Sequence, residues 1–434
     1  MKISKVETKL FEYTSYVESD DEGHGHPAKN PRKVSQCMVI IETDEGHKGY
    51  SFGANPQIVE KVISPILLGE NPFFREKIWE KMMHMQRIVT QIDERILSTI
   101  DLALWDLVGI IMGQPVNNIL GLYRDKVPAY ASTMCGDTIK GGLSTPEEYG
   151  NFAEWCVKEK GYRAVKLHGW MPPIEGAPDP KKDIMACAAV REAVGDDIPL
   201  MLDSYHFYSR MEALWIGREL EKLNFYWFEE PMDESSMSSY KWLSEQLDIP
   251  IIGPETMTGK ISTRAEWIKN DVVDILRGGV GDLGGLTPLM KVAHLAESYN
   301  MAMEVHGGKE GNLHALGSMR LPGEFYERGL LHPHVDYEKP PDYLDEIIHY
   351  VGKSYDFFWG SLKQSLLFNG NNNSNNKDLL NSGKLYVAKF NEDNTGEWIE
   401  LNPKTTGFES QAEICIYTRI AASKVGATSL SDIS

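Results

Sequence analysis

The sequence predicts an α/β protein: a modified, TIM-like (β/α) barrel with an N-terminal α+β domain and a short C-terminal extension. From about residue 127, short apolar runs alternate with helical stretches. Residues 1–125 instead mix hairpin and helical patterns, and the composition changes again after about residue 350. Repeated βα units imply a parallel sheet, and a series this long favours closure into a barrel.

The N-terminal domain is expected over residues 1–125. Apolar segments at 39–43 and 49–53 flank Asp44-Glu45-Gly46, which predicts a β-hairpin. Helical periodicity follows from Gln57 and again over residues 73–113.

The barrel is expected over residues 126–330. Each predicted strand is short and apolar, at 164–167, 200–202, 227–228, 251–253, 274–276 and 302–305. Helical stretches such as 211–222 and 287–299 lie between them. A proline-rich loop at 171–180 is expected over the site, and residues 331–352 are expected to return toward the N-terminal domain.

Residues 353–434 differ in character from the rest of the chain. The asparagine-rich tract at 370–376 cannot bury apolar area, so it predicts a mobile segment. Alternating residues at 384–390 and 397–401 flank a turn at 392–396 and predict one hairpin. We expect this tail to pack loosely on the barrel.

Composition narrows the class of partner and the compartment. The 434 residues carry a net charge of −19, which disfavours nucleic acid and anionic membranes as partners. Five cysteines without a paired pattern predict free thiols, and no apolar stretch has the length of a membrane span. We expect a cytoplasmic protein, a homo-oligomer, that acts on a small molecule.

Three acidic residues follow apolar runs at equal intervals. Asp203, Glu229 and Glu255 are each 26 residues apart (203 to 229 and 229 to 255), about one strand-and-helix unit. Carboxylates at the C-terminal ends of successive parallel strands converge at one end of a barrel. Oxygen ligands suit a hard cation, so the spacing predicts a Mg²⁺ site.

Three further residues are candidates for proton transfer. Lys166 and His168 alternate at the end of one strand, so both are expected to face the barrel mouth. Their mutual repulsion near a metal is expected to lower the pKa of Lys166 toward that of a usable base. His306 ends a later strand and is expected to approach from the opposite side. A metal between two such groups suits proton abstraction next to a carboxylate.

Together these motifs resemble the mandelate racemase subgroup of the enolase superfamily over residues 1–351. The resemblance includes Phe228-Glu229-Glu230-Pro231, Gly253-Pro254-Glu255 and Leu283-Gly284-Gly285. It implies that the three acids bind Mg²⁺, that Lys166 is the first lysine of a Lys-x-Lys motif, and that His306 is the catalytic histidine. It also implies that the N-terminal domain caps the site, and the chemistry implied runs through an enediolate. Substrate contacts are expected from the loop with His24 and His26, and from Tyr205 and His206.

The sequence departs from the subgroup pattern at three places. His168 stands where the second lysine is usual, which leaves open whether Lys166 or His168 is the base. Gly279 stands where an aspartate usually pairs with the catalytic histidine, and neither Asp282 nearby nor Asp274 at the strand matches that position, so His306 is expected to lack its orienting carboxylate. The acid that usually follows that histidine matches Glu327 best, with Glu324 behind it.

The tail resembles a different family, the PhoX-type alkaline phosphatases, which are β-propellers that use calcium and iron. Only about 80 residues match, too few to build a propeller, so no phosphatase site is expected. The resemblance implies a fusion, natural or artefactual, near residue 351.

The leading hypothesis is a Mg²⁺-dependent lyase, a dehydratase that converts an aldonate or aldarate into a 2-keto-3-deoxy acid. A racemase or epimerase of a hydroxy acid is the second hypothesis, and solvent exchange without keto-acid product would favour it. An inactive truncated fusion is the third. The sequence alone does not name the sugar.

Overall fold

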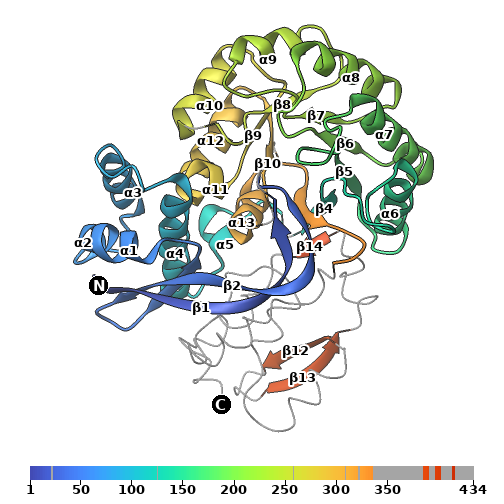
Figure 1. The fold of residues 1–434 in the computed structure, drawn as a ribbon. Coiled ribbons are helices and arrows are strands. Elements are labelled where there is room, and N and C mark those ends of the chain that lie inside the picture. The colour runs from blue at the N-terminus through green and yellow to red at the C-terminus, as the bar shows by residue number, and fades with distance from the viewer. Residues whose placement is uncertain are drawn as a thin grey trace.

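The structure is a computed structural model that describes residues 1–20, 23–124, 126–257, 259–307, 309–320 and 323–335, and the backbone of 385–390, 396–401 and 413–415. Its main body is a ring of strands and helices with a long two-stranded ribbon and a group of helices beside it (Figure 1). The predicted fold class, a (β/α) barrel with an N-terminal α+β domain, is confirmed. The exact domain boundaries stay predictions.

The N-terminal sheet is antiparallel, in the order β1-β2-β3. Its strands are β1 (Ile3–Ser19), β2 (Gly25–Thr43) and β3 (Lys48–Phe52). The predicted hairpin is the β2–β3 pair, in which Ile40 lies opposite Tyr50. The length of β1 and of the first half of β2 was not predicted, because most of their side chains are exposed or half-buried and show no apolar alternation.

Helices cover one end of this sheet: α1 (Pro56–Ile58), the π-helix η1 (Val59–Ile63), α2 (Ser64–Leu67), α3 (Arg75–Met85), α4 (Glu94–Met112) and α5 (Val116–Leu120). Helix α4 is buried over most of its length. The Asp93 side chain caps its start by accepting from Ile96 N at 2.8 Å, and Gly113 ends it in the left-handed conformation.

The barrel strands are all parallel, in the order β10-β9-β8-β7-β6-β5-β4-β11. They are β4 (Lys126–Thr133), β5 (Ala164–His168), β6 (Leu200–Asp203), β7 (Trp227–Glu229), β8 (Ile251–Gly253), β9 (Ile275–Gly278), β10 (Ala302–Val305) and β11 (Tyr326–Leu331). The connecting helices are α6 (Pro146–Lys158), α7 (Pro180–Val194), α8 (Arg210–Lys222), α9 (Met237–Ser244), α10 (Lys260–Lys269), α11 (Val280–Leu283), α12 (Leu286–Ser298) and α13 (Glu310–Ser318). They form the outer layer around the strands (Figure 1).

A side chain joins the two ends of the sheet. Within the described residues no strand ladder links β10 to β11. The buried carboxylate of Glu304 on β10 instead accepts hydrogen bonds from Glu324 N at 2.8 Å and Phe325 N at 3.3 Å, just before β11. Burial raises the pKa of Glu304 to about 7, although these two amides lower it.

The N-terminal helices are fixed to the barrel by buried polar contacts. Asp101 on α4 accepts from Thr287 N at 2.9 Å and Thr287 Oγ1 at 2.6 Å at the start of α12. Trp105 Nε1 donates to the same hydroxyl at 2.9 Å, and Trp79 Nε1 on α3 donates to Gly284 O at 2.8 Å. These contacts fix how the N-terminal unit sits against the barrel.

The predicted tail hairpin is present as β12 (Leu385–Phe390) paired antiparallel with β13 (Gly396–Leu401). A third segment, β14 (Glu413–Cys415), pairs antiparallel with β4 of the barrel, which was not predicted. The asparagine-rich tract and most of residues 331–352 lie outside the described residues. The loose packing expected of the tail therefore stays a prediction.

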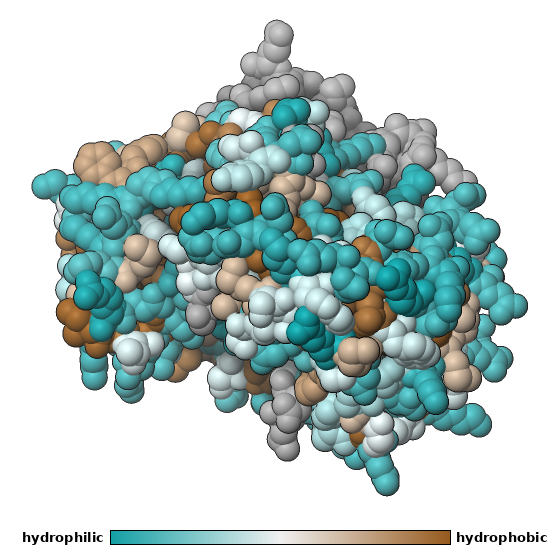
Figure 2. Space-filling view, turned by 90° about the horizontal axis from the view of Figure 1, so that it is seen from above, coloured by the Kyte–Doolittle hydropathy of each residue, from teal (hydrophilic) through white to brown (hydrophobic). Residues whose placement is uncertain are grey.

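The predictions about the cysteines and about membrane spans can be compared with the structure. Cys37, Cys135, Cys156 and Cys187 are free and buried, as expected for these four residues. Among the described helices, none has the length and apolar character needed to cross a bilayer. Hydrophilic residues dominate the face in Figure 2, with hydrophobic residues in separate small areas.

Candidate active site

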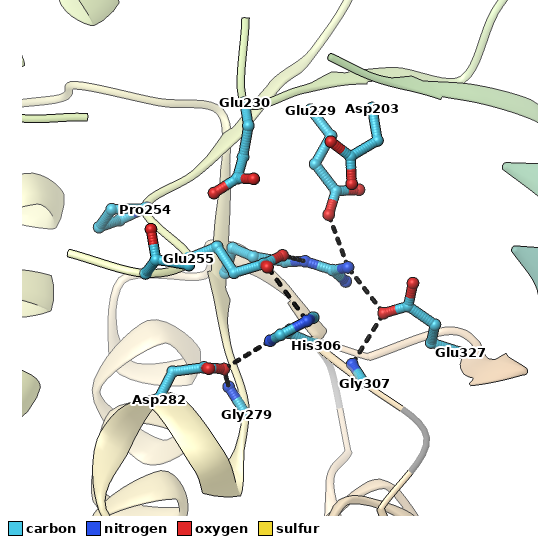
Figure 3. Close-up of polar contacts among 12 residues, drawn as sticks. Asp203, Glu229, Glu230, Pro254, Glu255, Gly279, Asp282, His306, Gly307 and Glu327 are labelled. Carbon is cyan, nitrogen blue, oxygen red and sulfur yellow. Dashed lines mark hydrogen bonds and ion pairs between the residues drawn. The ribbon is translucent and has the colours of Figure 1, made fainter. Parts of the chain in front are cut away.

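Three buried carboxylates meet at the C-terminal ends of adjacent strands. Asp203 ends β6, Glu229 ends β7, and Glu255 follows β8. Asp203 and Glu229 lie side by side in register, and ligand atoms of all three acids lie within 4.8 Å of one another. The predicted convergence is therefore present, because equal spacing along the chain placed each acid at the same level of a parallel barrel (Figure 3).

Lys166 lies among these acids, as its position at the end of β5 predicted. Its Nζ is 2.9 Å from Glu229 Oε1, 3.2 Å from Asp203 Oδ2 and 2.9 Å from Glu327 Oε1. Burial by itself would lower the pKa of Lys166, but Glu229 and Glu327 raise it well above its ordinary value. The expectation of a lowered pKa is wrong for this arrangement, because three carboxylates contact the ammonium.

His168 also faces the site, as predicted. Its Nε2 is 3.0 Å from Asp203 Oδ2, and its Nδ1 is 2.6 Å from Thr133 O. A backbone carbonyl only accepts, so the proton sits on Nδ1 and fixes the ring orientation. His168 is thus held by β4 on one side and directed at a carboxylate of the triad on the other.

The expectation that His306 lacks an orienting carboxylate is wrong. His306 Nδ1 is 2.7 Å from Asp282 Oδ2, and Asp282 also accepts from Gly279 N at 2.8 Å (Figure 3). Asp282 lies on α11, one helical turn beyond Gly279, so counting along the chain missed it. A Cβ on Gly279 would lie 2.2 Å from the His306 carbonyl oxygen, so a side chain does not fit there.

Asp282 and a carboxylate of the triad together set the pKa of His306. The other ring nitrogen, Nε2, is 3.0 Å from Glu255 Oε1. Burial would lower the pKa of His306, but Asp282 and Glu255 raise it to about 10. In the structure His306 is therefore a cation held between a carboxylate of the triad and its own orienting aspartate.

Glu327 belongs to the site, whereas Glu324 does not. Glu327 is buried and accepts from Gly307 N at 2.7 Å, in addition to its contact with Lys166. Glu324 accepts from the Tyr226 hydroxyl at 2.6 Å in an exposed position. The preference for Glu327 made from the sequence agrees with these positions.

Arg277 is a site residue that the sequence reasoning missed. It is fully buried on β9, and its Nη2 is 2.6 Å from Glu229 Oε1 and 2.9 Å from Glu327 Oε2. Its Nε is 3.2 Å from Glu255 Oε2. The sequence did contain a signal for this residue, because Arg277 lies inside an apolar strand that ends at the same level as the acids. A buried guanidinium needs carboxylate partners.

The N-terminal ribbon reaches the site at the turn between β1 and β2. His24 is buried there, with its ring 4.6 Å from the Tyr205 ring, and Tyr205 is 4.9 Å from the His168 ring. His24 and His26 both contact Asp20, at 3.2 Å and 2.8 Å. The His24–Tyr205–His168 row connects the N-terminal domain to the barrel mouth, and the substrate contacts expected of His24 and Tyr205 stay predictions.

The chemistry of the triad fits a hard divalent cation. Its ligands would be oxygen atoms only, which Mg²⁺ prefers, and Lys166, Arg277 and His306 contact these carboxylates from the surrounding strands. Trp227 Nε1 donates to Glu229 Oε2 at 2.9 Å and Tyr205 N donates to Asp203 Oδ1 at 3.1 Å, so the ligands are oriented by neighbouring groups.

Family comparisons agree with this geometry. Residues 148–349 match the family described as enolase C-terminal domain-like, and residues 28–121 match the mandelate racemase / muconate lactonizing enzyme N-terminal domain. Residues 350–432 match the alkaline phosphatase PhoX family, in agreement with the resemblance seen in the tail.

Individual relatives are acid-sugar enzymes by name. An arabinonate dehydratase from Saccharolobus solfataricus is 31% identical over 68% of this chain and 79% of its own length. An L-talarate/galactarate dehydratase from Salmonella typhimurium is 31% identical over 65% of this chain and 70% of its own. A solved structure, a D-glucarate dehydratase from Agrobacterium tumefaciens complexed with magnesium, is 51% identical with a TM-score of 0.77, over 79% of this chain and 90% of that one.

Proposed function

This chain belongs to the enolase superfamily, in its mandelate racemase branch, and on that premise we propose that it is a Mg²⁺-dependent acid-sugar dehydratase. The reaction removes water from C2 and C3 of an aldonate or aldarate and yields a 2-keto-3-deoxy acid. The observation that carries the proposal is the placement of Lys166 and His306 on opposite sides of three converging carboxylates.

Asp203, Glu229 and Glu255 are the proposed Mg²⁺ ligands. When bound, Mg²⁺ supplies positive charge that stabilises the negative charge developing on the substrate carboxylate. The three acids lie on β6, β7 and β8, between β5 with Lys166 and β10 with His306 in the order of the sheet. A substrate carboxylate at the triad therefore has one proton-transfer group on each side.

We assign Lys166, assisted by His168, to removal of the α-proton. The electron pair of that C–H bond enters the adjacent carboxylate system. Glu229 is one of the groups that raise the pKa of Lys166, so a cation bound by Glu229 reduces that effect and favours the neutral amine. Glu327 and Arg277 hold Lys166 and the triad in place through the contacts described above.

We assign His306 to the other face as the acid. Its Nε2 proton passes to the departing β-hydroxyl, which leaves as water, and the resulting enol becomes the 2-keto product. Asp282 orients the ring and stabilises its protonated form through the 2.7 Å contact at Nδ1. General acid–base groups of this kind each contribute roughly 10²–10⁴-fold in rate.

The capping ribbon is proposed to close over the sugar chain. His24 and Tyr205 are the residues whose rings face one another between the two domains. His26 and His206, also expected at the substrate, lie against Asp20 and Glu230 and stay predictions as substrate contacts.

An aldarate is the first substrate class to test, because the D-glucarate dehydratase mentioned above is 51% identical to this chain. Purified protein would be incubated with Mg²⁺ and a panel of aldarates and aldonates, and 2-keto acid would be measured. We expect keto acid from at least one of them, with D-glucarate first. Absence of keto acid from the whole panel would argue against dehydration.

Racemisation or epimerisation is the second candidate, and one comparison favours it. A racemase from Streptomyces coelicolor with bound magnesium is 25% identical to this chain, with a TM-score of 0.64. Exchange of the α-proton with solvent deuterium without keto acid would identify this reaction. Neither exchange nor keto acid would favour the third candidate, an inactive fusion.

A further inference from the structure

A second group of potential metal ligands lies next to the carboxylate triad. His206, Glu230 and Glu234 bring one nitrogen and two carboxylate oxygens within 4.8 Å of one another. His206 lies in the turn after β6, and the two glutamates follow β7. None of the three belongs to the set Asp203, Glu229 and Glu255, so this group does not overlap the proposed Mg²⁺ ligands.

Two atoms of this group have no hydrogen-bond partner among the described residues. Glu230 is 1% exposed, and its Oε1 accepts no hydrogen bond from any described residue. His206 Nδ1 is likewise buried without one; it lies 3.5 Å from Glu230 Oε1 but does not form a hydrogen bond with it. In Figure 3 the Glu230 carboxylate stands apart from the Asp203–Glu229 pair, and no contact is drawn to it. A buried carboxylate oxygen without a donor is costly, and a cation bound beside it would offset that cost.

The third member, Glu234, is held in a fixed orientation. Its Oε2 accepts from Thr256 N at 3.0 Å, Met257 N at 2.9 Å and Thr256 Oγ1 at 3.2 Å. Among the residues that the structure describes, its Oε1 accepts one hydrogen bond, from Glu255 N, and a carboxylate oxygen has two lone pairs, so one remains for another partner. Supporting hydrogen bonds of this kind are typical of residues that orient a metal ligand.

The backbone also holds His206 toward Glu230. His206 N donates to Glu230 O at 2.8 Å, and Phe207 forms an isolated bridge with Met232. His206 has φ of 62° and Glu230 has φ of 44°, both in the left-handed region that such residues rarely adopt. The close approach of the imidazole to the buried carboxylate is thus built into the turn.

We propose that His206, Glu230 and Glu234 form a second divalent cation site, selective for a zinc-class transition metal rather than Mg²⁺. One imidazole nitrogen with two carboxylates is a ligand set that Zn²⁺ accepts, usually with water in the remaining position. The His206 side chain is 30% exposed, which gives solvent and the ion a route to the site. Mg²⁺ requires oxygen ligands in near-octahedral geometry, which this set does not supply.

An ion at this second site would stabilise the turn next to the candidate active site. The turn that carries His206 also carries Tyr205, whose ring contacts His168 and His24. An ion at His206 and Glu230 fixes that turn and neutralises a carboxylate beside the triad. Binding of this ion does not depend on which substrate the protein uses.

The experiment counts bound metal in the full-length protein. Protein stripped of metal is saturated with Mg²⁺, dialysed against Zn²⁺ and assayed for both metals by elemental analysis. We expect one equivalent of Zn²⁺ in addition to Mg²⁺. His206→Asn, which tolerates the left-handed backbone, and Glu230→Gln should each weaken Zn²⁺ binding by roughly 100-fold or more while retaining Mg²⁺. The Co²⁺ absorption spectrum of His206→Asn should lose the signature of a nitrogen ligand, because His206 supplies the nitrogen atom of the proposed set.

Two controls separate this site from its neighbours. Asp203→Asn should lose Mg²⁺ and keep Zn²⁺. His26→Asn tests the other histidine group, Asp20, His24 and His26, which also brings ligand atoms within 4.8 Å. Zn²⁺ that survives His206→Asn but is lost in His26→Asn would overturn the proposal, and so would the absence of Zn²⁺ from Mg²⁺-loaded wild-type protein. Far-UV circular dichroism of each variant would show whether it is folded.

Discussion

Replacement of Asp282 by asparagine tests the assignment of His306 most selectively. The change keeps the size of the side chain and removes the negative charge 2.7 Å from His306 Nδ1. We expect His306 to lose its fixed orientation and part of its protonated population, since Asp282 is the largest of the groups that raise its pKa to about 10 against the effect of burial. The acid step that expels the hydroxyl should slow.

The size of the effect follows from the contact. A hydrogen bond to a charged group contributes about 1.5–3 kcal/mol. If this stabilisation is lost only in the transition state, kcat falls roughly 10- to 150-fold. Removing the imidazole itself in His306→Asn should cost more, on the order of 10²–10⁴-fold.

The assay has two readouts on the same proteins. Keto-acid formation reports dehydration, and α-proton exchange in deuterium oxide reports the base. Asp282→Asn and His306→Asn should slow dehydration and still permit exchange, because Lys166 is untouched. Asp271→Asn makes the same chemical change at an exposed site and should be neutral. If exchange vanishes in His306→Asn but survives in Lys166→Ala, the roles of acid and base are reversed and the reasoning is refuted.

Three further outcomes are expected. Chelation should abolish activity, and Mg²⁺ at about 100 times its Kd should stabilise the wild type by about 2.7 kcal/mol but not Asp203→Asn, as measured by urea unfolding. Deletion of residues 353–434 should leave kcat largely intact; a large loss would show that the tail replaces part of the capping domain. Glu304→Ala leaves the Glu324 and Phe325 amides without their acceptor, and the loss at the buried Phe325 amide alone should destabilise by about 1–3 kcal/mol. Glu324→Gln, which keeps Glu304, should cost far less, and equal effects would contradict the role of Glu304 in closing the barrel.

The barrel and the triad were predictable because both follow from periodic features. Strands in a parallel barrel are short and apolar, and each acid ended one of them at the same spacing. Lys166, His168 and His306 followed from the same rule. The long β1–β2 ribbon was not predictable in this way, because a two-stranded ribbon with exposed side chains leaves no apolar pattern.

The predictions about the site were wrong or incomplete where a residue's role depends on contacts with other segments of the chain. Asp282 was set aside because it did not match an expected position, although one turn of helix brings it to His306. The pKa of Lys166 depends on Glu229 and Glu327, which lie on other strands, and its direction could not be read from Lys166 and His168 alone. Arg277 acts through the same acids, and its role becomes clear only once they are seen to converge.

The most direct test of the central proposal is the Mg²⁺ dependence of keto-acid formation. Metal-stripped wild type, Asp203→Asn and Lys166→Ala would be assayed on D-glucarate and the wider acid-sugar panel, with and without added Mg²⁺. The proposal predicts 2-keto-3-deoxy acid only from wild type with Mg²⁺, and loss in both variants. Product formed without a divalent metal, or undiminished in Asp203→Asn, would contradict it.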